Sequence, residues 1–168
     1  MRVTAFAAFL FVVTVPIVSA DSVDDQSTRE SKIDRFAWDG PLFLKDKSLP
    51  ALRRLGQLKA ESVQKAANRH NPAQTDEFRT LRFDGLEIYG FVGASQELWP
   101  IHVTITDVHW KVLHGLDVGA PSERVLNVLG QPKEMTGNIM TYQGETERVD
   151  FHVGKNRITK IEFHYYLD

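Results

Sequence analysis

Residues 52–59 read LRRLGQLK, and residues 126–133 read LNVLGQPK. Both segments have leucine at their first and fourth positions, followed by Gly-Gln and a lysine at the eighth. Two matching segments separated by 66 residues, each followed by a polar stretch and then by strand-like sequence, indicate a divergent internal duplication.

Each of these segments ends a short predicted helix. The first begins near Ser48, a suitable N-cap, has Pro50 in its first turn and stops at Gly56. The second opens at Pro121 and stops at Gly130. Apolar residues recur at helical spacing in both, which predicts one buried stripe per helix. The positions predicted to face the core are Leu49, Leu52, Leu55, Val125, Val128 and Leu129.

Antiparallel strands are predicted after each helix. Asp84-Gly85 is a two-residue link between alternating apolar and polar residues, which is a strong hairpin signal. A second link, at residues 154–157, joins two further alternating segments near the C-terminus. The predicted strands cover residues 80–83, 86–89, 101–106, 149–153 and 158–166.

Residues 59–70 leave two interpretations open. Their composition favours a helix, whereas their place in the repeat corresponds to residues 138–142, which have strand character. The repeat argument favours a strand.

The fold prediction is α+β, with two divergent helix-plus-antiparallel-strand repeats at about 42–92 and 101–166. Because each helix has a single apolar stripe, the helices should pack on one face of the antiparallel sheet. A single domain is expected over residues 35–168. Residues 21–34 contain only two aliphatic side chains, so they are predicted to form a flexible leader.

Residues 1–20 have the pattern of a secretory signal peptide. Arg2 precedes an apolar run, and Val18-Ser19-Ala20 provides a cleavage site before Asp21. Removing this segment leaves 19 Lys and Arg against 22 Asp and Glu, a net charge of −3. This weak acidity argues against nucleic acid or an anionic membrane as a partner. The chain has no cysteine, hence no disulfide and no lipid-attachment thiol, and we expect a periplasmic or secreted protein without a stable membrane anchor.

The second repeat resembles a known family. Gly115-Leu116-Asp117-Val118-Gly119, the helix ending in Leu129-Gly130-Gln131-Pro132, Val149-x-Phe151 and Lys160-Ile161-x-Phe163 are similar to the small repeat of the SmpA/OmlA (BamE-like) and beta-lactamase-inhibitor-like (BLIP-like) envelope proteins. The resemblance covers residues 115–163, with a weaker echo at 48–92. It implies helices packed on one face of an antiparallel sheet and a free face or rim that binds another protein.

This chain departs from the family at two places. The assembly lipoproteins of the group carry a lipid-modified cysteine, which is absent here and weakens a role in outer-membrane assembly. The group tends to have Ser or Thr capping the second helix, where this chain has Pro121-Ser122.

The last hairpin carries the candidate site. If Phe151 and Phe163 face the core, alternation places their neighbours on the opposite face of the sheet. The residues predicted to form a protein-binding surface are Asp150, His152, Glu162, His164 and Tyr166. Their carboxylates would suit a basic partner. The same groups leave open a zinc site or an acid/base pair, as well as an ordinary solvated sheet face.

Other candidate motifs are weaker. Ser95 lacks the second glycine of a nucleophile elbow, and the histidines form no compact metal motif. Trp99 and Trp110 bracket the central strand, where they serve either the core or a binding surface.

Because no catalytic constellation emerges, the predicted function is that of a non-enzymatic exported protein-binding module without a cofactor. Within that class, the resemblance favours an inhibitor-like or immunity-like protein that blocks another exported protein. The alternatives are an envelope assembly or scaffolding accessory, and a metal-binding protein or metal-dependent hydrolase using the last hairpin.

Overall fold

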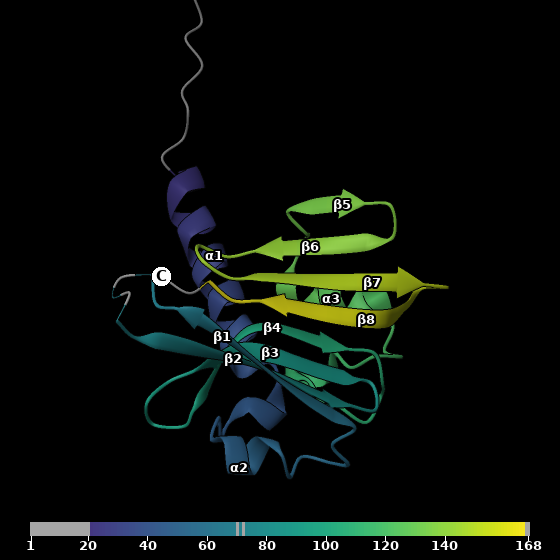
Figure 1. The fold of residues 1–168 in the computed structure, drawn as a ribbon. Helices are drawn as coiled ribbons and strands as arrows, with labels where there is room; N and C mark the ends of the chain where they lie inside the picture. Colours follow the sequence, from purple (N-terminus) through teal and green to yellow (C-terminus); the bar gives the residue numbers. More distant parts are fainter. Residues whose placement is uncertain (1–20, 70, 72, 167–168) are drawn as a thin grey trace, which may run out of the picture.

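One antiparallel sheet organises the chain in the computed structural model, which describes residues 21–69, 71 and 73–166. The predicted signal peptide lies outside these residues. The sheet has eight strands in the order β1-β2-β3-β4-β8-β7-β6-β5 (Figure 1). The strands are β1 (Ala60–Ala67), β2 (Thr75–Phe83), β3 (Leu86–Val92), β4 (Leu98–Ile105), β5 (Glu134–Thr136), β6 (Ile139–Gln143), β7 (Arg148–Gly154) and β8 (Arg157–His164). The predicted mixed α+β class is confirmed.

Strands that are neighbours in sequence are also neighbours in the sheet, apart from one junction. Strands β1–β4 form one meander, and β5–β8 form another. The two meet where β4 pairs with β8 over the short register from His102↔His164 to Ile105↔Ile161. Residues distant in sequence therefore share one continuous sheet surface.

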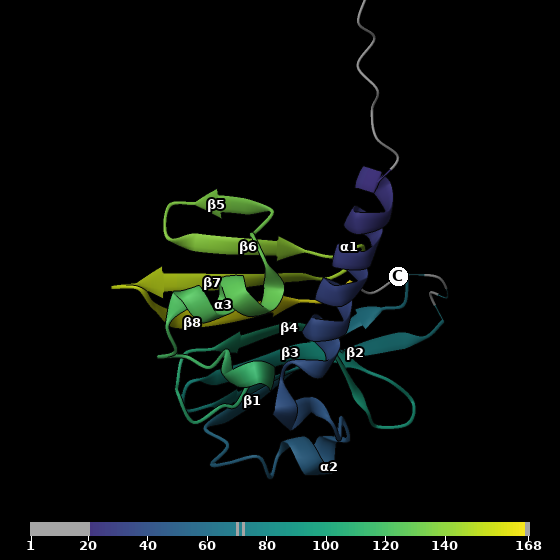
Figure 2. The ribbon, with the colours of Figure 1, turned by 180° about the vertical axis from the view of Figure 1, so that it is seen from behind.

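Helices α1 (Asp21–Asp39) and α3 (Ser122–Leu129) lie on the same side of this sheet, and the short α2 (Leu49–Leu52) lies near its lower end (Figure 2). Two 3-10 turns, at Leu42–Leu44 and Leu113–Gly115, complete the helical elements of the described chain. The opposite face of the sheet carries no helix in this part of the chain (Figure 1). We call it the open face.

Helix α3 agrees closely with its prediction. It follows Pro121 and ends at Gly130, whose φ of 84° is readily adopted by glycine. Val125 and Leu129 are buried, and Val128 is partly buried against the core.

The first predicted helix, over residues 48–56, is shorter than expected. Regular helix ends at Leu52, and turns follow. Leu49 and Leu52 are buried as predicted, whereas Leu55 is only partly buried because it lies beyond the helix.

The main difference from the sequence prediction is α1. Residues 21–34, expected to form a flexible leader, lie within this helix. Ile33, Phe36 and Ala37 recur at helical spacing and are buried, and the Phe36 ring centroid lies 6.3 Å from that of Phe151 in β7. Few apolar residues anchor the helix because only its C-terminal half reaches the core.

Asp34 attaches α1 to the turn between β6 and β7. Its carboxylate accepts hydrogen bonds from the backbone N–H groups of Glu145, Thr146 and Glu147, at 3.0, 3.3 and 2.9 Å. Gly144 permits this approach, since a Cβ there would lie 2.0 Å from Oδ1 of Asp34. Asp34 thus caps the turn with one charged side chain.

Buried polar contacts also join α1 to the C-terminal end of the chain. The Tyr165 hydroxyl donates to the Ala37 carbonyl at 2.8 Å, and Trp38 Nε1 donates to Glu147 Oε1 at 3.1 Å. The other oxygen of Glu147 accepts the backbone N–H of Tyr166 at 3.0 Å. Burial raises the pKa of Glu147 despite these hydrogen bonds.

The ambiguous segment at residues 59–70 contains strand β1, which pairs with β2 along its whole length. Both predicted hairpins form. Gly85 has a φ of 66° in the β2–β3 turn, and Lys155 and Asn156 have φ of 50° and 58° in the β7–β8 turn, as expected of two-residue links between twisted strands.

Among the described residues, no helix is long and apolar enough to cross a membrane.

Candidate functional site

Alternation along β7 and β8 separates the core from the candidate site. Val149, Phe151, Ile161 and Phe163 are fully buried, and the Phe36 ring of α1 lies 6.0 Å from that of Phe163. The intervening side chains of Asp150, His152, Glu162 and His164 therefore lie on the open face. The structure brings these four predicted residues together.

His164 contacts both an acid and a base from β7. Its Nε2 lies 3.1 Å from Oδ2 of Asp150 and 3.1 Å from Nη2 of Arg148. Arg148 also pairs with Asp150, with Nε 3.2 Å from Oδ2. A neutral imidazole can accept from the guanidinium at Nε2, whereas an Nε2–H would donate to the carboxylate.

Glu162 has a similar environment. Its Oε2 lies 2.6 Å from Nε2 of His152 and 2.9 Å from Nζ of Lys160. The register places Glu162 opposite Asp150, so two carboxylates lie side by side, each with its own histidine and its own cation.

These contacts determine the charge of the two acids. Burial pushes the pKa of Asp150 up, but the hydrogen bond from His164 and the charge of Arg148 outweigh it and hold the pKa below its usual value. For Glu162, burial is likewise outweighed by the contacts with Lys160 and His152, which lower the pKa. Both carboxylates are therefore ionised and internally paired, and they offer less free negative charge to a basic partner than the sequence indicated.

Asp150 is also more buried than the sequence prediction implied. Its residue is only 8% exposed, because Arg148 and His164 lie against it. Asp150 therefore holds Arg148 and His164 in place on the open face, and its own charge is largely covered.

His102 joins the site from β4, and sequence analysis did not place it there. Its ring stacks on that of His164, with centroids 4.6 Å apart and planes 21° apart, and its Nε2 lies 3.7 Å from Oε1 of Glu162. Burial, together with the neighbouring His164, lowers the pKa of His102. The alternation of the strand put His102 on its polar side, but the β4–β8 pairing that makes it a neighbour of His164 has no local signal.

Tyr166 differs from the other predicted residues. It follows the last strand and is 64% exposed. Its backbone binds Glu147, and no recorded contact in the described chain joins its side chain to the histidines. We call His102, His152, His164, Asp150 and Glu162 the histidine cluster, which excludes Tyr166.

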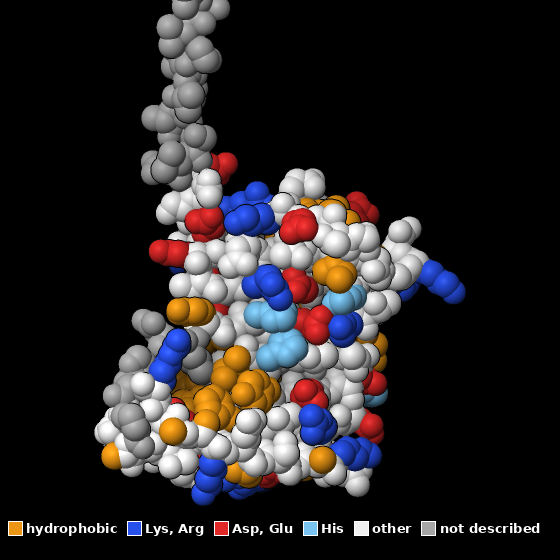
Figure 3. Space-filling model, turned by 45° about the horizontal axis from the view of Figure 1, so that its top comes forward, with side chains coloured by type: hydrophobic (Ala, Val, Ile, Leu, Met, Phe, Trp, Pro, Cys, Tyr) orange, Lys and Arg blue, Asp and Glu red, His pale blue; other side chains and the backbone are white. Residues whose placement is uncertain are grey.

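Aromatic side chains extend the surface into the first meander. Tyr89 is opposite His102 in the β3–β4 register. Its ring stacks on that of Phe78 at 6.1 Å, and Phe78 contacts Phe91 at 5.9 Å. Figure 3 shows a hydrophobic patch directly beside histidine side chains on this face. The half-buried aromatic residues and the histidine cluster form one continuous surface across β2, β3, β4, β8 and β7.

The described residues contain no group of three or more His, Cys, Asp or Glu side chains arranged to hold a metal ion. In the histidine cluster, Arg148 and Lys160 already contact oxygens of Asp150 and Glu162. A cation would have to displace these two basic groups. The metal alternative therefore finds no support in this part of the chain.

The structure also shows the contacts of the weaker candidate residues from the sequence, Ser95, Trp110 and Trp99. Ser95 Oγ lies 3.3 Å from Glu97, and no histidine is recorded beside it in the described chain. Trp110 donates from Nε1 to the Asp84 carbonyl at 2.7 Å and packs against Phe83. Trp99 is 39% exposed.

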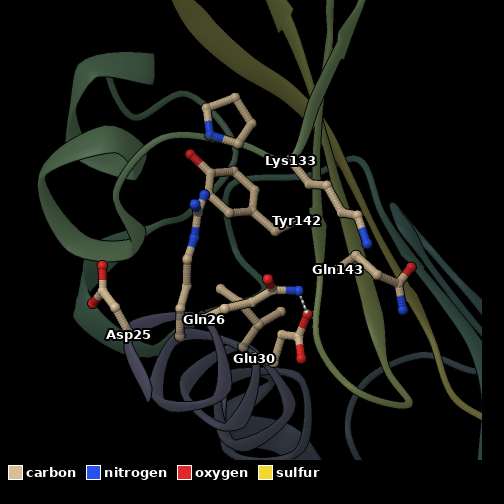
Figure 4. Close-up of a pocket in the computed structure, with 9 residues that line it drawn as sticks. Asp25, Gln26, Glu30, Lys133, Tyr142 and Gln143 are labelled. Carbon is tan, nitrogen blue, oxygen red and sulfur yellow. Dashed lines mark hydrogen bonds between the residues drawn. The ribbon is translucent and has the colours of Figure 1, made fainter. Parts of the chain in front are cut away.

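A pocket of about 400 Å³ lies between α1 and β6 (Figure 4). Its wall includes two acids, Asp25 and Glu30, and two bases, Arg29 and Lys133. Tyr142 also lines the pocket. Its hydroxyl donates to the Gly130 carbonyl at 2.8 Å, and burial raises the pKa of Tyr142 to about 12. The mixed charges select no class of ligand. Sequence analysis missed the pocket because α1, which forms one wall, was not predicted.

Comparison with known proteins adds no relative. No protein-family model, curated protein or solved structure matches the chain. The resemblance to the SmpA/OmlA and beta-lactamase-inhibitor-like repeat therefore stays a prediction.

Proposed function

We propose that this chain is a non-enzymatic, exported protein-binding module that acts in an inhibitor-like or immunity-like manner, by covering part of another exported protein. The binding surface is the open face of the sheet, centred on the histidine cluster and extended by Tyr89, Phe78 and Phe91.

The observation that carries this proposal is the row of side chains that crosses the junction of the two meanders. Tyr89, His102, His164 and Arg148 are successive cross-strand partners. Aromatic rings, imidazoles and arginine are the groups that contribute most at protein interfaces, because they combine contact area with directed hydrogen bonds. Here they lie on a rigid sheet, which limits the entropy lost on binding.

The charge pattern indicates the kind of partner. The acids and bases of the cluster neutralise one another, so strong electrostatic attraction to a highly basic or acidic protein is not expected. The proposed partner has an apolar patch that can pack against aromatic rings, beside polar groups that can hydrogen-bond to the imidazoles.

We also propose the finer architecture of two divergent repeats. Each meander of four strands is preceded by a short helix, α2 or α3, and the matching LRRLGQLK and LNVLGQPK segments connect these helices to the strands. This order supports the proposed relation to the SmpA/OmlA (BamE-like) and beta-lactamase-inhibitor-like envelope proteins. In such an arrangement the open face spans both repeats.

The test is affinity capture from the exported fraction of a native host with immobilised wild-type protein and two variants. The Tyr89→Ala, His164→Ala double variant should retain its fold and lose the captured protein, with affinity reduced by about tenfold or more if one of the two is a hot spot. Asn127→Ala, at an exposed position of α3, is the matched control and should bind like the wild type. Equal capture by all three proteins would place the interface elsewhere.

A further inference from the structure

Strand β1 forms one end of the sheet, and none of the residues that the structure describes pairs with its outer edge. It is eight residues long and pairs with β2 on its other side. Most of its residues are exposed, including Val63 at 48%. The opposite end of the sheet is the three-residue β5. Long open edges readily pair with another strand, whereas very short ones do not.

The register shows which backbone groups face outward. Asn68 donates its N–H to the Gln74 carbonyl at 2.9 Å, which continues the register that pairs Ala67 with Thr75. In an antiparallel ladder, hydrogen-bonded residues alternate with residues whose N–H and C=O point away. Even-numbered residues of β1 therefore bond to β2, and Glu61, Val63 and Lys65 direct their backbone groups outward.

These three residues are complementary to themselves about a two-fold axis. If Val63 is opposite Val63 of a second copy, Glu61 falls opposite Lys65 of that copy, and the converse pair follows by symmetry. All the paired residues are then ones with outward backbone groups, as a ladder requires. An axis through Glu61 or Lys65 would instead place like charges opposite each other, which is unfavourable.

We propose that the outer edge of β1 pairs antiparallel with β1 of a second copy of this chain, centred on Val63. The ladder joins two eight-stranded sheets, an isologous contact of the kind that gives a closed dimer. Backbone hydrogen bonds supply the affinity, and the Glu61–Lys65 pairs select the register.

The surroundings of the edge suit this pairing. Glu61 accepts hydrogen bonds from Arg53, at 2.8 Å, and from Arg79, which hold its carboxylate in place and offset part of its charge. Its pair with Lys65 of the second copy therefore selects the register, while the backbone ladder supplies the affinity. Lys65 is exposed and has no recorded ion pair within the described residues. Its ammonium group is therefore available to the second copy. This dimer leaves the histidine cluster unoccupied and does not depend on the proposed function.

The first test changes the backbone. Val63→Pro removes an outward N–H that β2 does not use, so the circular dichroism spectrum should be retained while the ladder is broken. Val63→Thr keeps the N–H and is the matched control. Sedimentation equilibrium is measured on protein expressed from the full-length sequence, over a series of protein concentrations that reaches about 1 mM. The wild type and the Val63→Thr control should both dimerise within this series. Val63→Pro should be monomeric.

The second test changes the register charges. Lys65→Glu places two acids opposite each other and should weaken self-association by about tenfold or more, as should Glu61→Lys. Mixing these two variants recreates only opposite-charge pairs, so a heterodimer should form.

A wild type that is monomeric throughout the concentration series would overturn the proposal and leave the edge to a strand of a different protein. A dimer that survives Val63→Pro would also overturn it, because the contact would then lie elsewhere. Failure of the two charge variants to form a heterodimer, with both folded, would refute the register.

Discussion

Ile33→Ala tests whether α1 is part of the folded domain. Ile33 is 1% exposed on a helix with few apolar residues, so truncation removes buried atoms that no neighbour replaces. At about 0.8 kcal/mol per buried methylene, the transfer loss is roughly 2.4 kcal/mol. The whole cost of such a truncation, which includes the cavity left behind, is typically about 2 to 5 kcal/mol, and we expect Ile33→Ala to fall in that range.

This loss is a large fraction of the stability of a small domain, which is about 5 to 15 kcal/mol. It should lower the Tm by about 6 to 15 °C, at roughly 3 °C per kcal/mol for a chain of this size. Urea unfolding followed by tryptophan fluorescence gives the free energy directly, since the described chain contains Trp38, Trp99 and Trp110.

Ser31→Ala is the matched control, because Ser31 is exposed on the same helix and alanine is the better helix former. It should leave the free energy of unfolding within about 0.5 kcal/mol of the wild type. If Ile33→Ala behaves like this control, residues 21–34 do not pack on the sheet, and our account of α1 is refuted.

Three further predictions concern other parts of the chain. Gly85→Ala should destabilise the domain by at least about 2 kcal/mol in urea unfolding, because its φ is positive and a Cβ would meet Asp107 at 2.2 Å; Gly137→Ala, with positive φ but open space, should cost clearly less. The pKa of Glu147 is raised in the folded state, so its contribution to stability is fully present below its unfolded value of about 4.3 and is lost as the pH rises through the folded pKa. The free energy of unfolding of wild type minus that of Glu147→Gln should therefore fall as the pH rises above about 4.3, and a flat difference would contradict the burial argument. Intact-mass measurement of the protein exported by a bacterial host should give Asp21 as the first residue, and a chain that retains Met1 would mean that the signal is not cleaved.

Local signals in the sequence predicted local structure well. Pro121 and Gly130 bound α3 to within a residue or so, since a fixed φ and a positive φ act on the backbone directly. Asp84-Gly85 gave the hairpin for the same reason. Alternation alone placed Asp150, His152, Glu162 and His164 on one face.

Features that depend on long-range pairing were not predictable. Helix α1 has a short local signal in the helical spacing of Ile33, Phe36 and Ala37, but its attachment through Asp34 to a turn more than a hundred residues away has none. The stacking of His102 on His164 requires the β4–β8 junction. Burial of Asp150 depends on the conformation of Arg148. In the first two cases the determining partner comes from another element of the fold, and Asp150 needs His164 of β8 beside it as well as Arg148 of its own strand.

Site-specific crosslinking shows whether the open face of the sheet contacts another protein. The chain contains no cysteine, so a single introduced thiol carries a photoactivatable crosslinker at one known position. Thr104→Cys places it on the open face, where Thr104 lies between Glu87 and Glu162 in the register. Asn127→Cys places it on the exposed side of α3, behind the sheet. Our account predicts that illumination in the exported fraction crosslinks a discrete partner to the Thr104→Cys protein and not to Asn127→Cys. A partner crosslinked through Asn127→Cys alone would contradict it.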